Sequence, residues 1–315
     1  MSQKRTISIV VPAFNEEENV GPLHAAVTEA LAPLSERYDH ELIFVDDGSR
    51  DGTLAALRGL TSTDPRVRVV KLSRNFGHQA ALTAGMEAAR GEAVVTMDCD
   101  LQDPPDLIPK MVAAWESGNR VVYARRIARD DNLFKKWTAA LYYRLLDRVS
   151  DVRIPRQVGD FRLLDRVVVK NLIALGEHAR YLRGMVAWLG FQHAFVDFAR
   201  PERIHGRTHY SVRKMVRLAM DGLLSFSTLP IKCGLWCGAM TILVSLTLLV
   251  CMLWDHFVCR TPYPLHMWFM LSLFGLVGVQ FIVIWMLGEY VGRIYGDVLK
   301  RPLYVVDGDS GSSTV

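Results

Sequence analysis

The sequence predicts an α/β protein in which a mostly parallel, Rossmann-like sheet has helices on both faces and is followed by a two-helix transmembrane hairpin. Two observations predict the sheet. β-rich and helical segments alternate over the first 125 residues, and polar residues follow each expected strand. A third observation predicts the hairpin, because two long uncharged runs lie near the C-terminal end.

The expected strands are short β-rich runs, and the expected helices carry apolar residues at helical spacing. Strands are expected at residues 7–11, 42–45, 67–72, 93–97 and 121–123, and helices at 16–31, 53–60, 79–89 and 107–115. This alternation indicates a parallel sheet with right-handed crossovers. Ligands bind beyond the carboxyl ends of such strands, so we expect the functional site at that edge.

Polar clusters follow all five expected strands. They are Asn15-Glu16, Asp46-Asp47-Gly48-Ser49, Arg74-Asn75, Asp98-Cys99-Asp100 and Arg125-Arg126. Neither GxGxxG nor GxxxxGK[ST] occurs in the chain, which removes the main support for dinucleotide binding or a P-loop. Phosphate groups must therefore be held by other means.

Asp98 and Asp100 end an apolar run and form the most informative of these clusters. Two neighbouring carboxylates repel each other unless a cation lies between them. A Mg²⁺ or Mn²⁺ ion that also binds a diphosphate would supply that cation, and Gln102 could add a neutral oxygen. The alternative is a turn or a helix start, for which Asp103-Pro104-Pro105 would be sufficient.

The uncharged runs 234–254 and 265–288 are each long enough to cross a hydrocarbon layer of about 30 Å. Basic residues precede the first run and follow the second, whereas the link 255–264 contains only Arg260. The positive-inside rule therefore places both termini in the cytoplasm. The alternative is a pair of buried helices in a soluble protein.

Residues 133–149 and 212–229 predict amphipathic helices with basic and apolar faces. Such helices suit the surface of an anionic bilayer, although packing against the soluble domain would use the same pattern. Glycines at four-residue spacing, such as Gly288/Gly292/Gly296, would allow close helix contacts within the hairpin or in a homo-oligomer. The net charge of +4 with no long basic block argues against nucleic acid as a partner.

Four ordered motifs together resemble the family 2 glycosyltransferases of the GT-A fold. They are Val11–Glu16, Asp46–Ser49, Ser73–His78 and Asp98–Asp103. Val158–Leu163 and Gly288–Tyr295 resemble the polyprenyl-phosphate branch of that family, which includes the bactoprenol glucosyltransferases, the undecaprenyl-phosphate formamido-arabinose transferase and dolichol-phosphate mannose synthase. The resemblance extends from about residue 5 to residue 305.

The resemblance implies a role for individual residues. It implies a nucleotide pocket at Pro12, Ala13, Asn15, Glu16, Asp47 and Asp98, and a metal site at Asp98, Asp100 and Gln102. It implies catalytic roles for Asp100 and for Asp160, which is often assigned as the base. An acceptor phosphate with a second pKa of about 6 is already nucleophilic, so Asp160 could instead position the acceptor or the metal.

Five arginines are expected to bind the acceptor phosphate or the diphosphate, with plain attraction to the membrane surface as the alternative. They are Arg125, Arg126, Arg129, Arg203 and Arg207. The loop Gly206-Arg207-Thr208-His209-Tyr210-Ser211 departs from the Gly-Glu-Ser-Lys-Tyr-Ser that relatives commonly have. The family's contacts in this loop therefore do not transfer directly.

Four regions follow. Residues 1–130 form a nucleotide-sugar-binding GT-A core, 131–232 an acceptor-side part with interface helices, 233–290 two transmembrane helices, and 291–315 a cytoplasmic tail that is disordered from Asp307. No zinc, serine-hydrolase or processive-synthase signature occurs.

The sequence thus predicts an enzyme at the cytoplasmic face of the bacterial inner membrane that transfers a sugar from a nucleotide-sugar to polyprenyl (undecaprenyl) phosphate. UDP-glucose is the first choice of donor, ahead of GDP-mannose and other UDP-sugars. Inversion is expected because no second enzymic nucleophile is apparent. Two alternatives stay open: transfer to a lipid hydroxyl such as that of diacylglycerol or ceramide, and a non-catalytic membrane-anchored nucleotide-sugar-binding protein.

Overall fold

The computed structural model describes residues 4–126, 155, 157–177, 180–198, 240, 247, 250, 254, 264–299 and 301–307. Its described strands form one seven-stranded sheet in the order β3-β2-β1-β4-β6-β5-β7. The strands are β1 (Arg5–Ala13), β2 (Tyr38–Asp46), β3 (Val67–Lys71), β4 (Ala93–Thr96), β5 (Val121–Arg126), β6 (Val158–Asp165) and β7 (His193–Phe198).

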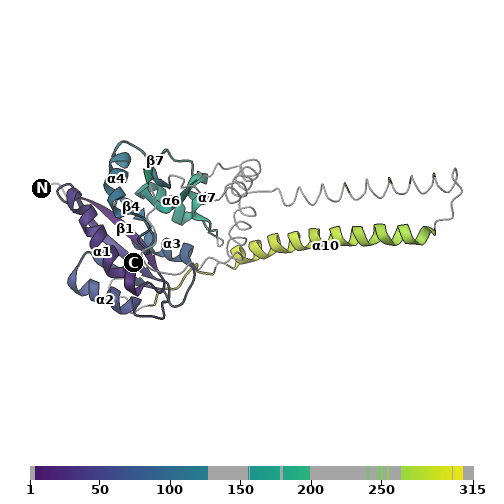
Figure 1. The fold of residues 1–315 in the computed structure, drawn as a ribbon, viewed down its shortest axis with the longest axis horizontal. Coiled ribbons are helices and arrows are strands. Elements are labelled where there is room, and N and C mark those ends of the chain that lie inside the picture. The colour runs from purple at the N-terminus through teal and green to yellow at the C-terminus, as the bar shows by residue number, and fades with distance from the viewer. Residues whose placement is uncertain are drawn as a thin grey trace.

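Helices cover both faces of this sheet, as expected (Figure 1). The helices are α1 (Glu17–Leu31), α2 (Thr53–Thr63), α3 (His78–Ala88), α4 (Ile108–Glu116), α6 (Arg166–Ala174), α7 (Leu182–Trp188) and α10 (Leu265–Val298), with 3₁₀ turns η1 (Ala32–Leu34) and η2 (Pro105–Leu107). Apolar residues of α1, α2 and α4 pack on one face of the sheet, and those of α3, α6 and α7 on the other.

The first four strands confirm the prediction of a parallel sheet. β1 pairs in parallel with β2 and with β4, and β2 pairs in parallel with β3. Both faces of β1, β2 and β4 are buried over most of their length, so these strands are largely apolar runs rather than alternating patterns. Their carboxyl ends lie at one edge, which brings the loops after β1, β2 and β4 together.

Beyond β4 the sheet contains two strands that the sequence had not predicted, β6 and β7. β6 inserts antiparallel between β4 and β5, and β7 extends the sheet beyond β5. The sequence of β6 was predicted as part of a family motif but not as a strand, because the charged residues Asp160 and Arg162 interrupt its apolar pattern. Both are buried and bind each other, which is how a charged segment forms an inner strand.

The C-terminal segment 301–307 returns to the sheet and packs beside β3. Leu72 and Val306 form an antiparallel bridge, the Asp307 amide donates to the Lys71 carbonyl over 2.8 Å, and the Lys71 ammonium lies 2.6 Å from Asp307 Oδ2. The expectation of disorder was therefore wrong at Asp307 itself, because main-chain pairing fixes it. Residues 308–315 lie outside the described part.

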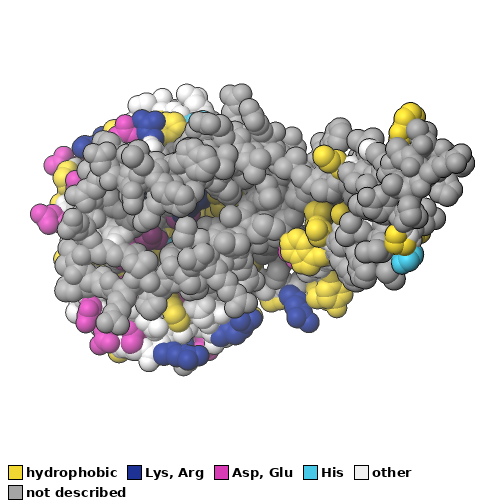
Figure 2. All heavy atoms as spheres, turned by 45° about the vertical axis from the view of Figure 1, so that its right-hand side comes forward, with side chains coloured by type: hydrophobic (Ala, Val, Ile, Leu, Met, Phe, Trp, Pro, Cys, Tyr) yellow, Lys and Arg dark blue, Asp and Glu magenta, His cyan; other side chains and the backbone are white. Residues whose placement is uncertain are grey.

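The second uncharged run lies within α10, a helix of 34 residues that extends away from the sheet domain (Figure 1). Several of its large apolar side chains are more than half exposed, among them Phe269, Ile282 and Trp285. Figure 2 shows hydrophobic side chains gathered on the elongated part of the molecule. Within the described ranges, no helix has the combined length and apolar character that a membrane span requires.

The other membrane-related predictions fall outside the described residues. Only Met240, Thr247, Val250 and Trp254 of the first uncharged run are described, each in helical conformation. The amphipathic segments 133–149 and 212–229 lie wholly outside.

Candidate active site

The loops after β1 and β2 are joined to each other by hydrogen bonds. The Asn15 amide donates to Ser49 Oγ over 3.0 Å, the Arg50 amide donates to Asn15 Oδ1 over 2.9 Å, and the Asp47 amide donates to the Ala13 carbonyl over 2.9 Å. Asn15 has a φ of 56°, a left-handed conformation that asparagine tolerates well. These contacts bring four residues of the expected nucleotide pocket together: Pro12, Ala13, Asn15 and Asp47.

Glu16, also expected in that pocket, lies at the start of α1. Its backbone amide donates to Thr53 Oγ1 over 2.8 Å, and its carboxylate accepts a hydrogen bond of 2.6 Å from Asn19 Nδ2. The side chain is half-buried and is oriented by the helix start.

The buried carboxylate of Asp47 binds the loop that connects β3 to α3. Its two oxygens accept hydrogen bonds from the amides of Phe76 and Gly77, over 2.7 and 2.9 Å. Burial raises the pKa of Asp47, and these two amide bonds partly oppose the shift. Gly48, with a φ of 71°, permits the close approach, since a Cβ there would lie 2.6 Å from the carbonyl carbon of Arg74. The structure thus gives Asp47 a loop-holding role.

The loop Asp98–Asp103, here called the acid loop, follows β4 at the same edge. The Asp98 amide donates to Asp103 Oδ2 over 3.1 Å, and the Gln102 amide donates to Asp100 Oδ1 over 3.2 Å. Two buried oxygens, Gln102 Oε1 and Asp103 Oδ1, have no hydrogen-bond partner among the described residues. Such an oxygen costs about 1–3 kcal/mol unless a donor or a cation reaches it.

The acid loop offers donors that fit a divalent metal. The described residues contain no ready-made group of three His, Cys, Asp or Glu side chains for a metal ion. The donors expected from the sequence are the carboxylates of Asp98 and Asp100 and the unpartnered amide oxygen of Gln102. All are hard oxygen ligands, and Mg²⁺ is commonly held by one or two carboxylates together with substrate phosphates.

Asp160 lies beside the acid loop at the centre of a cluster of cations, here called the Asp160 cluster. Its Oδ1 accepts from Arg162 Nη2 and, over 3.3 Å, from Arg183 Nε, and its Oδ2 accepts from Arg183 Nη2 over 3.0 Å. His78 Nε2 lies 3.4 Å from Asp160 Oδ2 and 3.7 Å from Asp98 Oδ1. His78 thereby connects the cluster to the acid loop.

The electrostatics of these groups follow from their partners. Burial would raise the pKa of Asp160, but Arg183, His78 and Arg162 outweigh it and hold that pKa well below its usual range. Burial would lower the pKa of His78, but the carboxylates of Asp160 and Asp98 raise it to about 9. A carboxylate so strongly held in its ionised form is a weak proton acceptor.

The structure describes two of the five expected phosphate-binding arginines, Arg125 and Arg126, and the two have different partners. Arg125 makes a double ion pair with Asp197, over 2.6 and 2.9 Å, and lies over the ring of Phe195. Arg126 Nη2 lies 3.7 Å from Asp103 Oδ1 in the acid loop. Arg129, Arg203 and Arg207 are outside the described residues.

Arg162, Arg183 and His78 are site residues to which the sequence had assigned no role. The alternation Asp160-Phe161-Arg162 was a usable signal for the first, since residues two apart in a strand share a face. His78 is the last residue of the motif Ser73–His78, for which no chemical role was predicted. Nothing local in the sequence points to Arg183, which reaches Asp160 from α7.

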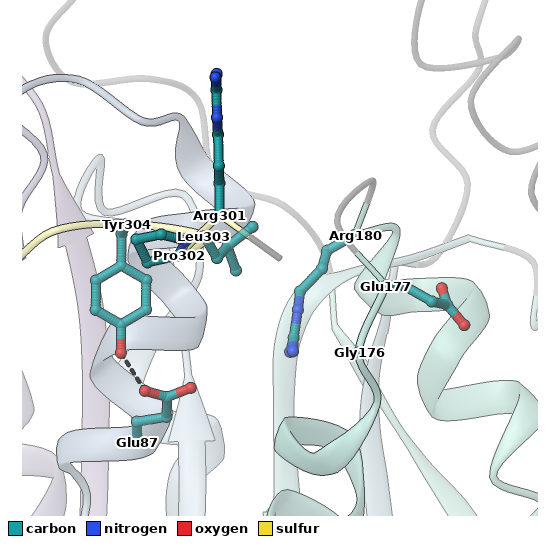
Figure 3. A pocket seen from close by; sticks show the side chains of 8 residues that line it. All are labelled: Glu87, Gly176, Glu177, Arg180, Arg301, Pro302, Leu303 and Tyr304. Atoms are coloured by element: carbon teal, nitrogen blue, oxygen red, sulfur yellow. Dashed lines mark hydrogen bonds between the residues drawn. The ribbon is translucent and has the colours of Figure 1, made fainter. Parts of the chain in front are cut away.

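A cavity of about 400 Å³ lies elsewhere, where the C-terminal segment meets the loop after α6 (Figure 3). It contains none of the expected site residues. Its lining consists of Glu87, Gly176, Glu177, Arg180, Arg301, Pro302, Leu303 and Tyr304. The Tyr304 hydroxyl donates to Glu87, which ties the segment to α3 (Figure 3).

The fold is thus a mixed α/β sheet that carries the joined loops after β1 and β2 and the acid loop after β4 at one edge. The chain belongs to glycosyl transferase family 2, whose sequence profile matches residues 8–173. It is a glycosyltransferase.

The relatives match nearly the whole chain. The uncharacterized glycosyltransferase YkcC of Bacillus subtilis is 42% identical over 99% of this chain and 96% of its own. The SfII prophage-derived bactoprenol glucosyl transferase of Shigella flexneri is 38% identical over 95% of this chain and 97% of its own. Among solved structures, glucosyl-3-phosphoglycerate synthase from Mycobacterium tuberculosis, in complex with Mn²⁺, UDP-glucose and glycerol 3-phosphate, is 22% identical, with a TM-score of 0.45 over 70% of this chain and 79% of its own.

Proposed function

We propose that this glycosyltransferase transfers glucose from UDP-glucose to undecaprenyl phosphate at the cytoplasmic face of the bacterial inner membrane, with inversion at the anomeric carbon. The observation that carries the proposal is the similarity to the bactoprenol glucosyl transferase of Shigella flexneri over 95% of the chain. That similarity includes both the sheet domain and the apolar C-terminal region, so it concerns the anchor as well as the site.

Membrane attachment is part of this proposal. The runs 234–254 and 265–288 carry no charge, and the second belongs to a helix whose large apolar side chains are exposed. Exposed apolar surface of this extent requires a covering, and a bilayer would supply it. A hairpin would hold the site where a lipid presents its head group, which raises the effective concentration of the acceptor.

The donor would lie across the loops after β1, β2 and β4. The joined loops that contain Asn15 and Asp47 would hold the nucleoside, and Asp98, Asp100 and Gln102 would hold Mg²⁺ or Mn²⁺. When bound, such an ion neutralises charge that develops on a departing diphosphate. The residues of the acid loop thus orient the leaving group.

Transfer would be a single displacement. An acceptor phosphate oxygen forms the bond to the anomeric carbon, the bond from that carbon to the diphosphate oxygen breaks, and its electron pair leaves with the nucleoside diphosphate. A dianionic phosphate has no proton to lose, so the step needs no base. This matches Asp160, whose arginine partners make it a weak base. A lipid hydroxyl would need a real base, so the geometry favours the phosphate acceptor.

The test uses the full-length chain purified in detergent. It is incubated with Mg²⁺ or Mn²⁺, with a panel of nucleotide-sugars, and with undecaprenyl phosphate or diacylglycerol, and the lipid product is identified by mass. We expect a glucosylated undecaprenyl phosphate from UDP-glucose. A product formed only on diacylglycerol would refute the acceptor, and a lack of metal-dependent turnover with every donor would refute the enzyme activity.

A further inference from the structure

The C-terminal residues 303–307, here called the strap, pair antiparallel with the chain at the end of β3. Main-chain hydrogen bonds flank the bridge on both sides. On one side the Ser73 amide donates to the Val305 carbonyl over 2.9 Å. On the other side the Asp307 amide donates to the Lys71 carbonyl over 2.8 Å. Because bonds on both sides fix the register, the strap is attached by its backbone and not only by the ion pair of Asp307.

This pairing lies at the start of the loop that joins β3 to α3. The other end of the same loop is bound to the site, because the Asp47 carboxylate accepts hydrogen bonds from the amides of Phe76 and Gly77. α3 then begins at His78, whose Nε2 lies 3.4 Å from Asp160 Oδ2. One short loop therefore connects the strap to the edge of the sheet that contains the candidate site.

The strap follows α10 after a short link. α10 ends at Val298, and seven Cα–Cα steps lead from there to Val305. Even a fully extended chain covers at most about 25 Å over this length. Pro302 stiffens the link, because its ring restricts φ. Figure 1 shows the chain returning from α10 to the sheet domain, so the edge with the site is held close to the end of this helix.

Apolar surface continues along α10 beyond the uncharged run 265–288. Four large side chains at three- and four-residue spacing share one face of the helix and are each 60–69% exposed. They are Val291, Ile294, Tyr295 and Val298. With the proposed function, the bilayer interface would cover this face, because an amphipathic helix places its apolar face there. The link to the strap would then start at the membrane surface.

Two connections restrict the sheet domain more than one. The chain also joins the sheet domain to the first uncharged run, 234–254, so the strap is a second connection to the proposed hairpin. One flexible connection lets a domain rotate, whereas a second one at a separate point limits that rotation. Rotation matters for a lipid acceptor, because its head group stays at the bilayer surface and cannot follow a site that turns away.

We propose that the strap is a positioning element for the lipid acceptor, because it holds the edge of the sheet with the acid loop toward the membrane surface at the end of α10. The inference rests on the proposed function and gives a role to a segment that neither the motifs nor the comparisons assign. The contacts of the strap described above lie at the end of β3 and on α3, so it acts through the loop between them. It determines where the site lies, whereas the acid loop and the Asp160 cluster contain the groups proposed for transfer.

The test lengthens the link and leaves the strap itself intact. A flexible insert of about eight Gly and Ser residues between Pro302 and Leu303 adds up to about 29 Å of reach. The same insert after Asp307 is the matched control, because it lies beyond the strap and leaves the link unchanged. The full-length variants are reconstituted in vesicles of phosphatidylethanolamine and phosphatidylglycerol with UDP-glucose. Each is assayed with two acceptors in the same vesicles, undecaprenyl phosphate in the bilayer and a short-chain polyprenyl phosphate dissolved in the buffer.

The two acceptors should respond differently to the longer link. We expect kcat/KM for undecaprenyl phosphate to fall about 10-fold, while kcat/KM for the soluble acceptor and the donor KM stay within about 2-fold of the wild type. The control insert should keep all three values. A merely structural role of the strap would instead lower transfer to both acceptors alike.

The outcomes separate the two proposals. If the wild-type chain glucosylates neither acceptor, the proposed function fails. If it glucosylates both, and the longer link keeps the wild-type kcat/KM for undecaprenyl phosphate, the inference about the strap alone fails. An equal loss with both acceptors would also overturn the positioning role.

Asp307→Pro tests the attachment of the strap. It removes the amide that donates to Lys71 and the carboxylate that pairs with the Lys71 ammonium. We expect the same selective loss with undecaprenyl phosphate, whereas Asp307→Asn keeps the amide and should recover most of that loss. A loss with the soluble acceptor as well would show a local effect on the loop between β3 and α3 and would overturn the positioning role. Should Asp307→Pro fail to fold, the longer link still decides the inference.

Discussion

The acid loop after β4 and the Asp160 cluster on β6 both bring carboxylates to one edge of the sheet, yet their hydrogen-bond partners differ. In the acid loop, the buried oxygens Gln102 Oε1 and Asp103 Oδ1 have no hydrogen-bond partner among the described residues. In the cluster, both oxygens of Asp160 accept hydrogen bonds from arginines. The first region is suited to take a cation, and the second already contains its cations.

The pKa shifts follow the same division. Burial raises the pKa of Asp98, whereas the cations around Asp160 overcome burial and lower its pKa. Residue type alone therefore does not make a carboxylate at a sheet edge a metal ligand or a base. Its role depends on which partners the fold brings to it.

The largest expected effect comes from removing the charge of Asp160. Asp160→Asn leaves the buried guanidinium of Arg162 without its anion, so we expect the free energy of unfolding to fall by about 3–5 kcal/mol. Denaturant unfolding of the detergent-purified chain measures this. Asp197→Asn, which breaks an exposed arginine pair, is the control and should have little effect. If Asp160→Asn and Asp197→Asn had the same free energy of unfolding, the buried pair of Asp160 and Arg162 would not stabilise the fold more than the exposed pair.

Substitution of a proposed metal ligand in the acid loop should lower activity rather than stability. Asp100→Ala should lower metal-dependent sugar transfer by about 100-fold and weaken Mn²⁺ affinity, because a proposed oxygen ligand is removed. Titration with Mn²⁺ and steady-state assays measure the two effects. Asp106→Ala, which changes an exposed carboxylate nearby, should leave both unchanged. Unaltered transfer and Mn²⁺ affinity in Asp100→Ala would remove the metal site from the proposal.

Gln102→Met should raise the stability of the metal-free protein and lower its affinity for Mn²⁺. Removing a buried oxygen that has no donor should raise the metal-free stability by about 1 kcal/mol. Removing a metal ligand should lower Mn²⁺ affinity about 10-fold. Thermal unfolding with and without Mn²⁺ tests both. A loss of stability without metal would show that this oxygen has a structural partner.

The smallest effect is expected far from both regions. Tyr304→Phe removes the hydroxyl that binds Glu87, so we expect a loss of about 0.5–1 kcal/mol in unfolding free energy. The acceptor KM and the Mn²⁺ affinity should both stay at their wild-type values. A change in either would show that the C-terminal segment influences the site through α3.

Much of the sheet could be predicted because its first strands are buried on both faces. The runs at β1, β2 and β4 are apolar and end in polar loops, so local pattern suffices. β6 and β7 could not be found in this way. β6 buries charges that pair only after folding, and the exposed and half-buried positions of β7 give it no apolar run.

The site was predictable to the same extent. The carboxylates of the acid loop are neighbours in sequence, so their mutual repulsion could be inferred before folding. Arg125 and Arg126 are also adjacent in sequence, but the structure directs one to Asp197 and the other toward Asp103. Adjacent residues in a strand point to opposite faces, so the count of positive charges could not say where each one acts.

By itself, the sequence determined the family, the parallel half of the sheet and the edge at which acidic residues collect, since each depends on residues that are close along the chain. Only the tertiary structure decided the environment of Asp160. Its partners come from α3, from its own strand and from α7, and His78 and Arg183 are separated from it by 82 and 23 residues. Long-range packing determines which charges meet in a buried place, and that determines what each of them can do.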